Sequence, residues 1–371
     1  MVRRSHLLCL LLAAAFAPLA AQAGPAYTVS TIAGLGGPAG LVTGLNNAGQ
    51  AVGNGFNADY AQNAYVSGSG TTTSLHPAGA NIVGSAANGI NNAGAVTGEL
   101  QYADGGTRAA VFAGGGVQTL GTFGGSYSTG YAINASGQVA GAAFLAGDAA
   151  MHAFVTQGGA MVDLGTLGGA SSLARSVNDA GAVTGYAEIN ADGLYTAFLY
   201  TNGVMQSLGS LGGDYSQGYA LNNAGMVVGY SSLAGNLGSS AFLYANGVMI
   251  DLGGFGGSES YATDINEAGD VVGAANDANG IQSAFLYSNG KLQNLNELID
   301  ASLGWTVTYA AAINDRGQIA AHGCRADGVC SDLLLSAVNA GDPADVPEPE
   351  TFTAGLLGLA LFGLLRRRSR K

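Results

Sequence analysis

Charged side chains are scarce in this chain of 371 residues, of which only 10% are Asp, Glu, Lys or Arg. Between the basic clusters at the two ends, five basic residues face all 24 acids, about 5 − 24 = −19 charges. A surface this acidic repels a phosphate backbone, so we expect no nucleic-acid partner. The five basic residues are Arg108, Arg175, Lys291, Arg316 and Arg325.

Helical periodicity and catalytic motifs are absent as well. No apolar spacing of three or four residues persists along the sequence, and neither Gly-x-Ser-x-Gly nor His-Glu-x-x-His occurs. A glycosidase needs two carboxylates about 5 to 10 Å apart. Glu99, Glu188, Glu259 and Asp264 could supply such a pair, but nothing in the sequence brings two of them together. We therefore predict that the protein is not an enzyme.

Glycine, by contrast, is abundant, at 62 of 371 residues. Hydrophobic residues make up 48% of the chain and proline is rare, which excludes a disordered protein. Glycine at fixed offsets predicts many tight turns.

An Asn-x-x-Gly turn recurs along the chain with steps of 45, 43, 44, 44, 44 and 48 residues. A period of this size indicates a repeat architecture. The asparagines are Asn46, Asn91, Asn134, Asn178, Asn222, Asn266 and Asn314.

One period contains four short strands. After Asn222 we expect strands at 226–231, 241–244, 248–252 and 260–265. Asn246-Gly247 predicts a two-residue type I′ hairpin, and Asn266 to Gly269 predicts the β-turn that leads into the next period. Four strands in about 44 residues is the size of a β-propeller blade.

The order of the strands predicts how the fold closes. The chain begins at Tyr27 with the strand type that ends each other repeat, and it finishes without that strand. We therefore predict an all-β, seven-bladed β-propeller with four-stranded blades, whose N-terminal strand completes the last blade and leaves no free edge. An open β-solenoid or a pair of β-sandwiches is the alternative, but neither end carries the polar cap that an open array needs.

The two ends of the chain carry address signals. Residues 1–23 predict a secretory signal peptide, because two arginines precede an apolar run, Leu7 to Ala17, and Ala21-Gln22-Ala23 then gives an A-x-A cleavage site. At the C-terminus, the apolar run 352–365 precedes a basic cluster. Its 14 residues are short for a spanning helix. We expect a weak anchor with its basic end in the cytoplasm, or a sorting tail.

The C-terminal pattern is more specific than an anchor. Val346-Pro347-Glu348-Pro349, a short apolar helix and an arginine cluster resemble the PEP-CTERM sorting signal of Gram-negative bacteria that make exopolysaccharide. The resemblance implies cleavage by an exosortase near Pro347, Glu348 and Pro349. It also implies passage through the inner membrane with transient anchoring by the C-terminal helix, then release to the cell surface or matrix. An ordinary anchor helix is the alternative.

The sequence therefore divides into three expected parts. They are the signal peptide 1–23, the repeat domain 24–342 and the sorting tail 343–371.

The repeats resemble the extracellular HAF-repeat family, over most of the chain. The His-Ala-Phe of that family occurs once, at His152 to Phe154, with related triplets at 196–198, 240–242 and 283–285 and a Asp-Leu-Gly-Thr-Leu-Gly-Gly segment at 163–169. The resemblance implies the repeat fold and an extracellular location, and it carries no established activity.

Cys324 and Cys330 are the two cysteines that remain once the signal peptide is removed. In an oxidising compartment, a pair six residues apart predicts a disulfide that closes a small loop. A zinc site is not expected, because two cysteines supply half of the ligands and the histidines are scattered.

If the N-terminal strand is outermost, the strand before each Asn turn lines a central channel. These strands carry aromatic residues with Ser and Thr between them, which suits stacking and hydrogen bonding to sugar rings. Packing between blades is the alternative role. The candidate ligand-binding residues are Tyr127, Tyr131, Tyr215, Tyr219, Tyr261, Trp305 and Tyr309.

We expect no cofactor or metal, with Ca²⁺ as the one ion for which ligands can be proposed. Asp163, Asp251, Asp264, Asn266 and Asp270 lie near turns and offer oxygen ligands. No EF-hand loop occurs, so turn formation through hydrogen bonds to their own backbone is the favoured interpretation.

Two functions remain open. The first is a secreted, non-catalytic surface or matrix protein that binds a glycan or a surface protein. The second is a secreted carbohydrate-active enzyme, a glycosidase or lyase, with its site at the channel. The loops between strands are small and polar in every repeat, which favours the first.

Overall fold

The computed structural model describes residues 26–37, 40–58, 60–79, 81–190 and 192–338. These residues form strands, tight turns and short 3-10 turns, so the chain is all-β as predicted. The predicted signal peptide and the sorting tail with Pro347, Glu348, Pro349 and its helix lie outside the described residues. Within the described ranges, no helix is long and apolar enough to cross a membrane.

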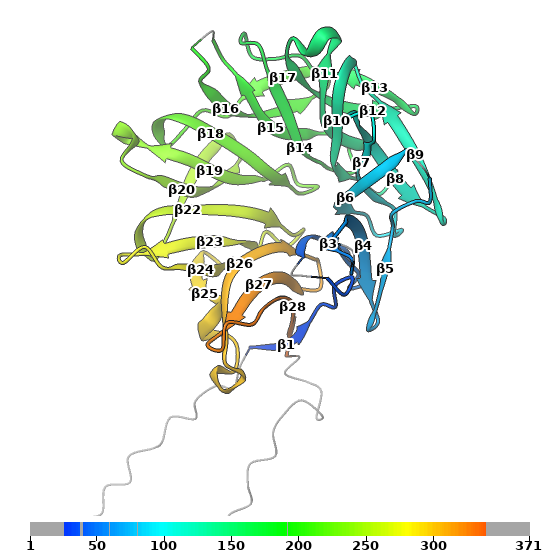
Figure 1. The fold of residues 1–371 in the computed structure, drawn as a ribbon. Coiled ribbons are helices and arrows are strands. Elements are labelled where there is room, and N and C mark those ends of the chain that lie inside the picture. Colours follow the sequence, from blue (N-terminus) through cyan, green and yellow to red (C-terminus); the bar gives the residue numbers. More distant parts are fainter. Residues whose placement is uncertain (1–25, 38–39, 59, 80, 191, 339–371) are drawn as a thin grey trace, which may run out of the picture.

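Consecutive antiparallel strands form units of four, which follow one another around a common centre in Figure 1. The first three units are β2 (Leu41–Leu45), β3 (Ala51–Phe56), β4 (Gln62–Gly68), β5 (Thr71–Ser74); β6 (Ile82–Ile90), β7 (Val96–Tyr102), β8 (Thr107–Ala113), β9 (Gly116–Gly121); and β10 (Gly124–Ile133), β11 (Val139–Leu145), β12 (Met151–Gln157), β13 (Ala160–Asp163). The next three are β14 (Ser172–Val177), β15 (Val183–Glu188), β16 (Tyr195–Thr201), β17 (Val204–Ser207); β18 (Gly212–Leu221), β19 (Val227–Leu233), β20 (Ser239–Ala245), β21 (Val248–Gly253); and β22 (Gly256–Ile265), β23 (Val271–Asp277), β24 (Gln282–Ser288), β25 (Lys291–Asn294).

The last unit combines the two ends of the chain. Its strand order is β1-β28-β27-β26, with β1 (Tyr27–Thr31) at the outer edge and β26 (Trp305–Ile313), β27 (Ile319–Arg325) and β28 (Cys330–Ala337) inside it. β1 pairs antiparallel with β28 from Tyr27↔Ala337 to Thr31↔Leu333, and Figure 1 shows blue β1 beside orange β28. The predicted pairing of the first strand with the last is therefore present.

The units remain open sheets. One parallel residue pair, Tyr127↔Thr107, joins the second unit to the third, and another, Ser239↔Glu259, joins the fifth to the sixth. No sheet in the described part of the chain closes on itself. Short 3-10 turns lie between strands, at η1 (Ala146–Asp148), η2 (Ala234–Asn236), η3 (Leu295–Glu297) and η4 (Ala301–Leu303).

The repeated asparagines connect the units. Each is buried, and its Oδ1 accepts the backbone N–H four residues further on, as Asn222 does from Met226 at 3.1 Å. Each Nδ2 donates to the backbone carbonyl of the next asparagine, for example Asn222 to Asn266 at 3.1 Å. Asn314 donates to the carbonyl of Asn46 at 2.9 Å, which closes the cycle.

Glycine on the second strand of a unit lies opposite a buried phenylalanine on the third strand and against the backbone of the first. Gly229 pairs with Phe242, which is 0% exposed, and a Cβ at Gly229 would lie 1.9 Å from the carbonyl oxygen of Gln217. The other pairs are Gly141 with Phe154, Gly185 with Phe198 and Gly273 with Phe285. The strands therefore pack at a distance that only glycine permits.

The predicted type I′ hairpin is also present. Asn246 and Gly247 have φ values of 52° and 82°, the two successive positive angles that this turn requires.

The apolar cores lie between neighbouring units. One cluster joins Ala153 and Val155 of β12 to Val183 and Phe198 of the following unit. The N–H of Ala153 donates to Ser172 Oγ on the next inner strand at 2.9 Å, and the same link recurs between Ala197 and Ser216. These units therefore bury an apolar face, and satisfy a backbone N–H, against the next unit.

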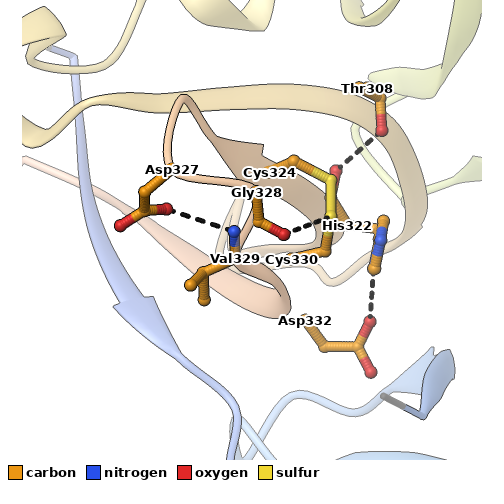
Figure 2. Close-up of a disulfide and its surroundings, with 8 residues drawn as sticks. All are labelled: Thr308, His322, Cys324, Asp327, Gly328, Val329, Cys330 and Asp332. Atoms are coloured by element: carbon orange, nitrogen blue, oxygen red, sulfur yellow. Dashed lines mark hydrogen bonds and ion pairs between the residues drawn. A yellow bond between two sulfur atoms is a disulfide. The ribbon is translucent and has the colours of Figure 1, made fainter. Parts of the chain in front are cut away.

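The hairpin of β27 and β28 carries the cysteine pair. Cys324 lies directly opposite Cys330, and the structure joins the two as a disulfide, shown in Figure 2. Beside it, Nδ1 of His322 lies 3.1 Å from a carboxylate oxygen of Asp332. That hydrogen bond raises the pKa of His322 above its usual range.

Candidate functional site: the central cavity

The inner strands of all the units enclose a central cavity of about 810 Å³, within the size range of small-molecule sites. Five of the predicted aromatic residues line it: Tyr131, Tyr215, Tyr219, Tyr261 and Tyr309.

One level of the wall consists of the residues three places before each repeated asparagine. All seven line the cavity: Thr43, Asn88, Tyr131, Arg175, Tyr219, Thr263 and Ala311. Because the strands share one register, residues from neighbouring units meet at this level. Arg175 therefore lies between a tyrosine on each side.

The Arg175 guanidinium lies between two aromatic faces. Its carbon is 4.6 Å from the ring centroid of Tyr131 and 5.3 Å from that of Tyr219. Tyr219 meets Tyr230 edge to face at 5.5 Å, and Tyr230 meets Tyr215 at 6.0 Å. Both distances to Arg175 are within the range of cation–π attraction, so the two rings hold the guanidinium in place.

A second aromatic pair lies on the next two inner strands. The rings of Tyr261 and Tyr309 are tilted by 38° with their centroids 6.2 Å apart. Burial raises the pKa of Tyr309 to about 12 and also raises the pKa of Tyr261 and Tyr131. The hydroxyls therefore stay protonated at neutral pH and can both donate and accept hydrogen bonds.

Two of the predicted residues, Tyr127 and Trp305, are not among the residues that line the cavity, although both lie on inner strands. The ring of Tyr127 packs on Phe144 at 6.0 Å, and its hydroxyl donates to Glu99 at 3.1 Å. Trp305 lies nine residues before Asn314 at the start of β26, where Arg325 stacks on it at 5.6 Å. Both side chains therefore contact residues that are not among those lining the cavity.

The acidic residues of the wall are held by hydrogen bonds. The two oxygens of Asp264 accept the N–H groups of Ile265 and Ile313 at 2.9 and 2.8 Å, and burial raises its pKa to about 7. At the end of the cavity formed by the Asn turns, Glu267 donates its N–H to Asp315, and Asn47 donates its side-chain amide to Asp315 at 2.7 Å.

The four carboxylates considered as candidates for a catalytic pair fall into two groups. Glu259 and Asp264 line the cavity, whereas Glu99 accepts from Tyr127 and Glu188 accepts from Tyr195 at 2.7 Å. No hydrogen bond joins any two of the four in the described part of the chain.

The candidate calcium ligands also have protein partners. Asp163 lies 2.9 Å from His152, Asp251 accepts from Ser240, and Asp270 accepts from Asn266 at 3.3 Å. Among the residues that the structure describes, the one cluster of at least three metal-ligating side chains is His322, Cys324 and Cys330, and the disulfide occupies its two sulfurs.

Arg175 did not figure among the residues predicted from the sequence. The sequence singles out Arg175 only when the repeats are aligned on their asparagines. The equivalent residue in every other repeat is then seen to be uncharged.

The comparison with family models finds the PEP-CTERM protein-sorting motif over residues 345–371. This motif indicates a protein that is processed by an exosortase and secreted through the membrane to the cell surface of a Gram-negative bacterium. No curated protein sequence matches the chain.

Solved structures with a similar fold are β-propellers at very low identity. The β-propeller domain of the trilobed protease from Pyrococcus furiosus, described as having an open Velcro topology, aligns with a TM-score of 0.53 and 8% identity over 82% of this chain and 99% of that one. YCF48 bound to a D1 peptide aligns with a TM-score of 0.50 and 9% identity over 87% of this chain and 97% of that one. These similarities show a propeller-like fold.

Proposed function

We propose that this protein is an exosortase-sorted extracellular protein that binds a glycan in its central cavity without altering it. The observation that carries this proposal is the cavity wall, where Tyr131, Tyr219, Tyr261 and Tyr309 present aromatic faces and protonated hydroxyls. Aromatic faces stack on sugar rings while hydroxyls pair with sugar hydroxyl groups. The sorting motif supports an extracellular ligand, and a matrix polysaccharide is our proposed one.

We propose a closed seven-bladed ring of HAF repeats as the scaffold of this site. The cycle of asparagine hydrogen bonds supports closure, because Asn314 reaches the carbonyl of Asn46 across the chain ends. The first residue of three of the four triplets supports the repeat assignment, since His152, Thr196 and Ser240 each contact a side chain eleven residues later. Closure gives the cavity a continuous wall.

A non-catalytic role is supported by Glu99 and Glu188, whose carboxylates are hydrogen-bonded to Tyr127 and Tyr195. The competing proposal is a carbohydrate-active enzyme. One observation favours it: Glu259 and Asp264 line the same cavity, and the pKa of Asp264 is raised to about 7, as a general acid requires.

A glycan array and a hydrolase and lyase panel, both run on the secreted protein, test the two proposals. We expect binding to at least one polysaccharide class and no new reducing or unsaturated ends. Loss of binding in Tyr219→Ala, with retention in Tyr127→Phe outside the cavity, would locate the site. Turnover of any polysaccharide would contradict the binding-protein proposal and support the enzyme proposal. Absence of both binding and turnover would contradict both proposals.

A further inference from the structure

Arg175 is the only basic side chain among the residues that line the cavity. It is half-buried, and no hydrogen bond or ion pair joins its guanidinium to any residue in the described ranges; its Nε is buried without a partner. The body of the chain has five basic residues against 24 acids, yet no described carboxylate forms an ion pair with this cation. A half-buried charge without an anion is costly to maintain by structure alone.

In three other repeats, the residue equivalent to Arg175 joins its unit to the next one through a hydrogen bond. Thr43 and Thr263 each donate to a backbone carbonyl of the next unit at 2.8 Å. Asn88 donates to the carbonyl of Gly130 in the next unit at 2.9 Å. Arg175 makes no such bond, so its hydrogen-bonding groups are not used to join the units.

The surroundings of Arg175 prepare it for a planar anion. The rings of Tyr131 and Tyr219 contact the guanidinium on their faces, at 4.6 and 5.3 Å, without using any of its N–H donors. A guanidinium fixed in this way loses little further freedom when it donates two parallel N–H bonds to a carboxylate. The tyrosine pair Tyr261 and Tyr309 lies in the same cavity for the sugar ring that carries the carboxylate.

We propose that the glycan bound in the cavity is a uronate-containing polysaccharide and that Arg175 binds the carboxylate of one uronate residue. This inference rests on the proposed glycan-binding function and names the class of glycan.

The acids of the wall set the direction of entry. Asp179, Glu267 and Asp315 form part of the rim at the Asn turns, where a polyanion is repelled. The level of Tyr215 carries one acid, Glu259, against these three at the Asn turns. A uronate chain therefore enters past Tyr215 and Tyr230, where repulsion is weaker, and presents a chain end to Arg175.

Isothermal titration of the secreted protein with uronate tetramers tests the proposal. The probes are tetragalacturonate, its fully methyl-esterified form, and tetramers of glucuronate and mannuronate. We expect at least one acidic tetramer to bind. For tetragalacturonate, the methyl ester, which removes only the charge, should bind about tenfold more weakly or worse. About 0.5 M NaCl should weaken binding of the acid and leave the ester unaffected.

The variant Arg175→Gln should weaken binding of the acidic tetramer about tenfold or more and change binding of a neutral glycan less than twofold. Lys291→Gln is the matched control, because it removes one positive charge from an exposed position on β25 outside the cavity. Unfolding temperatures of the two variants should both equal that of the wild type, which separates a binding role from a structural one.

Three results would overturn the inference. They are equal affinity for acid and ester, unchanged affinity in Arg175→Gln, and failure of all the acidic tetramers to bind. If neutral glycans still bind in any of these cases, the proposed glycan-binding function stands and only the uronate assignment fails.

Discussion

Each repeated asparagine satisfies two sets of backbone groups with one side chain. Its oxygen accepts an N–H of its own turn, and its amide donates to a carbonyl of the next unit. Asn222 is 2% exposed, so neither group could turn to water if the side chain were removed. An aspartate could replace the first function but, when ionised, not the second.

Replacing Asn222 with aspartate should therefore destabilise the protein in a pH-dependent way. At pH 7 we expect a loss of about 2–4 kcal/mol in the free energy of unfolding, because the carbonyl of Asn266 loses its donor and faces a buried charge. The loss should shrink near pH 4, where a protonated carboxyl can donate. Urea unfolding at the two pH values measures both.

Asn190→Asp is the control for that substitution. Asn190 lies in a loop, and its side-chain oxygen accepts the N–H of Asp192, a function that aspartate keeps. Its stability should stay within about 0.5 kcal/mol of the wild type. An Asn222→Asp protein as stable as this control would show that the cycle of hydrogen bonds contributes nothing.

Asp264 links two units through one carboxylate, with Ile265 on its own strand and Ile313 on β26. Burial raises its pKa to about 7, well above its ordinary value of 3.8. The folded protein therefore holds this proton more tightly than the unfolded chain does. Its contribution to stability is full below pH 3.8 and is lost as the pH rises through 7.

Comparing the wild type with Asp264→Asn isolates this contribution. Between about pH 4 and pH 8, the unfolding temperature of the wild type should fall relative to that of the variant, with most of the change complete by pH 7. Above pH 7 the difference should be constant. Thermal unfolding monitored by circular dichroism measures the difference in unfolding temperature between the two proteins. If this difference does not change with pH, the pKa of Asp264 is not raised.

At the scale of the element, the second strand of each unit determines how closely the sheet packs. Gly229 faces Phe242 and lies against the backbone of Gln217 on the inner strand. In the five repeats that have it, the Val-x-Gly pattern after the turn is thus a packing requirement, because a side chain would push the inner strand toward the cavity. The first repeat has Ala51-Val52-Gly53 instead, and the last has Ile319-Ala320-Ala321.

Substituting Gly229 with alanine should lower the free energy of unfolding by about 1–3 kcal/mol, because the new Cβ overlaps a carbonyl oxygen that cannot move away. Gly116→Ala on β9 is the matched control, where the nearest atom to a Cβ is 3.8 Å away. The control should unfold at the wild-type denaturant concentration. Equal midpoints for both variants would show that the inner strand adjusts freely.

At the scale of the whole molecule, the chain ends hold the last unit together. β1 covers β28, whose Leu333 and Leu335 are 0% exposed. The N–H of Val338 donates to the carbonyl of Ala26 at 2.9 Å, so the end of β28 lies beside the start of β1. A strand contributed by the other terminus makes the last unit depend on both ends of the sequence.

Deleting Tyr27 to Gly37 should therefore lower stability by roughly 3–6 kcal/mol, the cost of exposing the apolar side chains that this segment covers. A permuted chain tests the cause: residues 26–37 are attached after Val338 through an Asn-Gly turn, and the chain begins at residue 40. Thermal unfolding of the permuted chain should return to near the wild-type midpoint. A truncated protein that melts like the full one would contradict closure by this strand.

The sequence alone determined the all-β class, the repeat, the turn chemistry and the pairing of the first strand with the last, because these depend on local patterns with a fixed period. Asn246-Gly247 and the Asn-x-x-Gly turns need only their own backbone angles. Which side chains line the cavity depended on the tertiary structure. Tyr127 and Tyr215 occupy the same place in their repeats, yet Tyr127 turns to Glu99 and Tyr215 lines the cavity with Tyr230.

Contacts between units could not be read from any one repeat. The amide of each asparagine bonds a carbonyl 43 to 48 residues away, or across the chain ends from Asn314 to Asn46. The position of Arg175 between Tyr131 and Tyr219 likewise arises only when three units stand side by side. The sequence determined the repeating unit through local turns and strand pairing, and the tertiary structure decided which of the variable side chains meet, because their neighbours belong to other units.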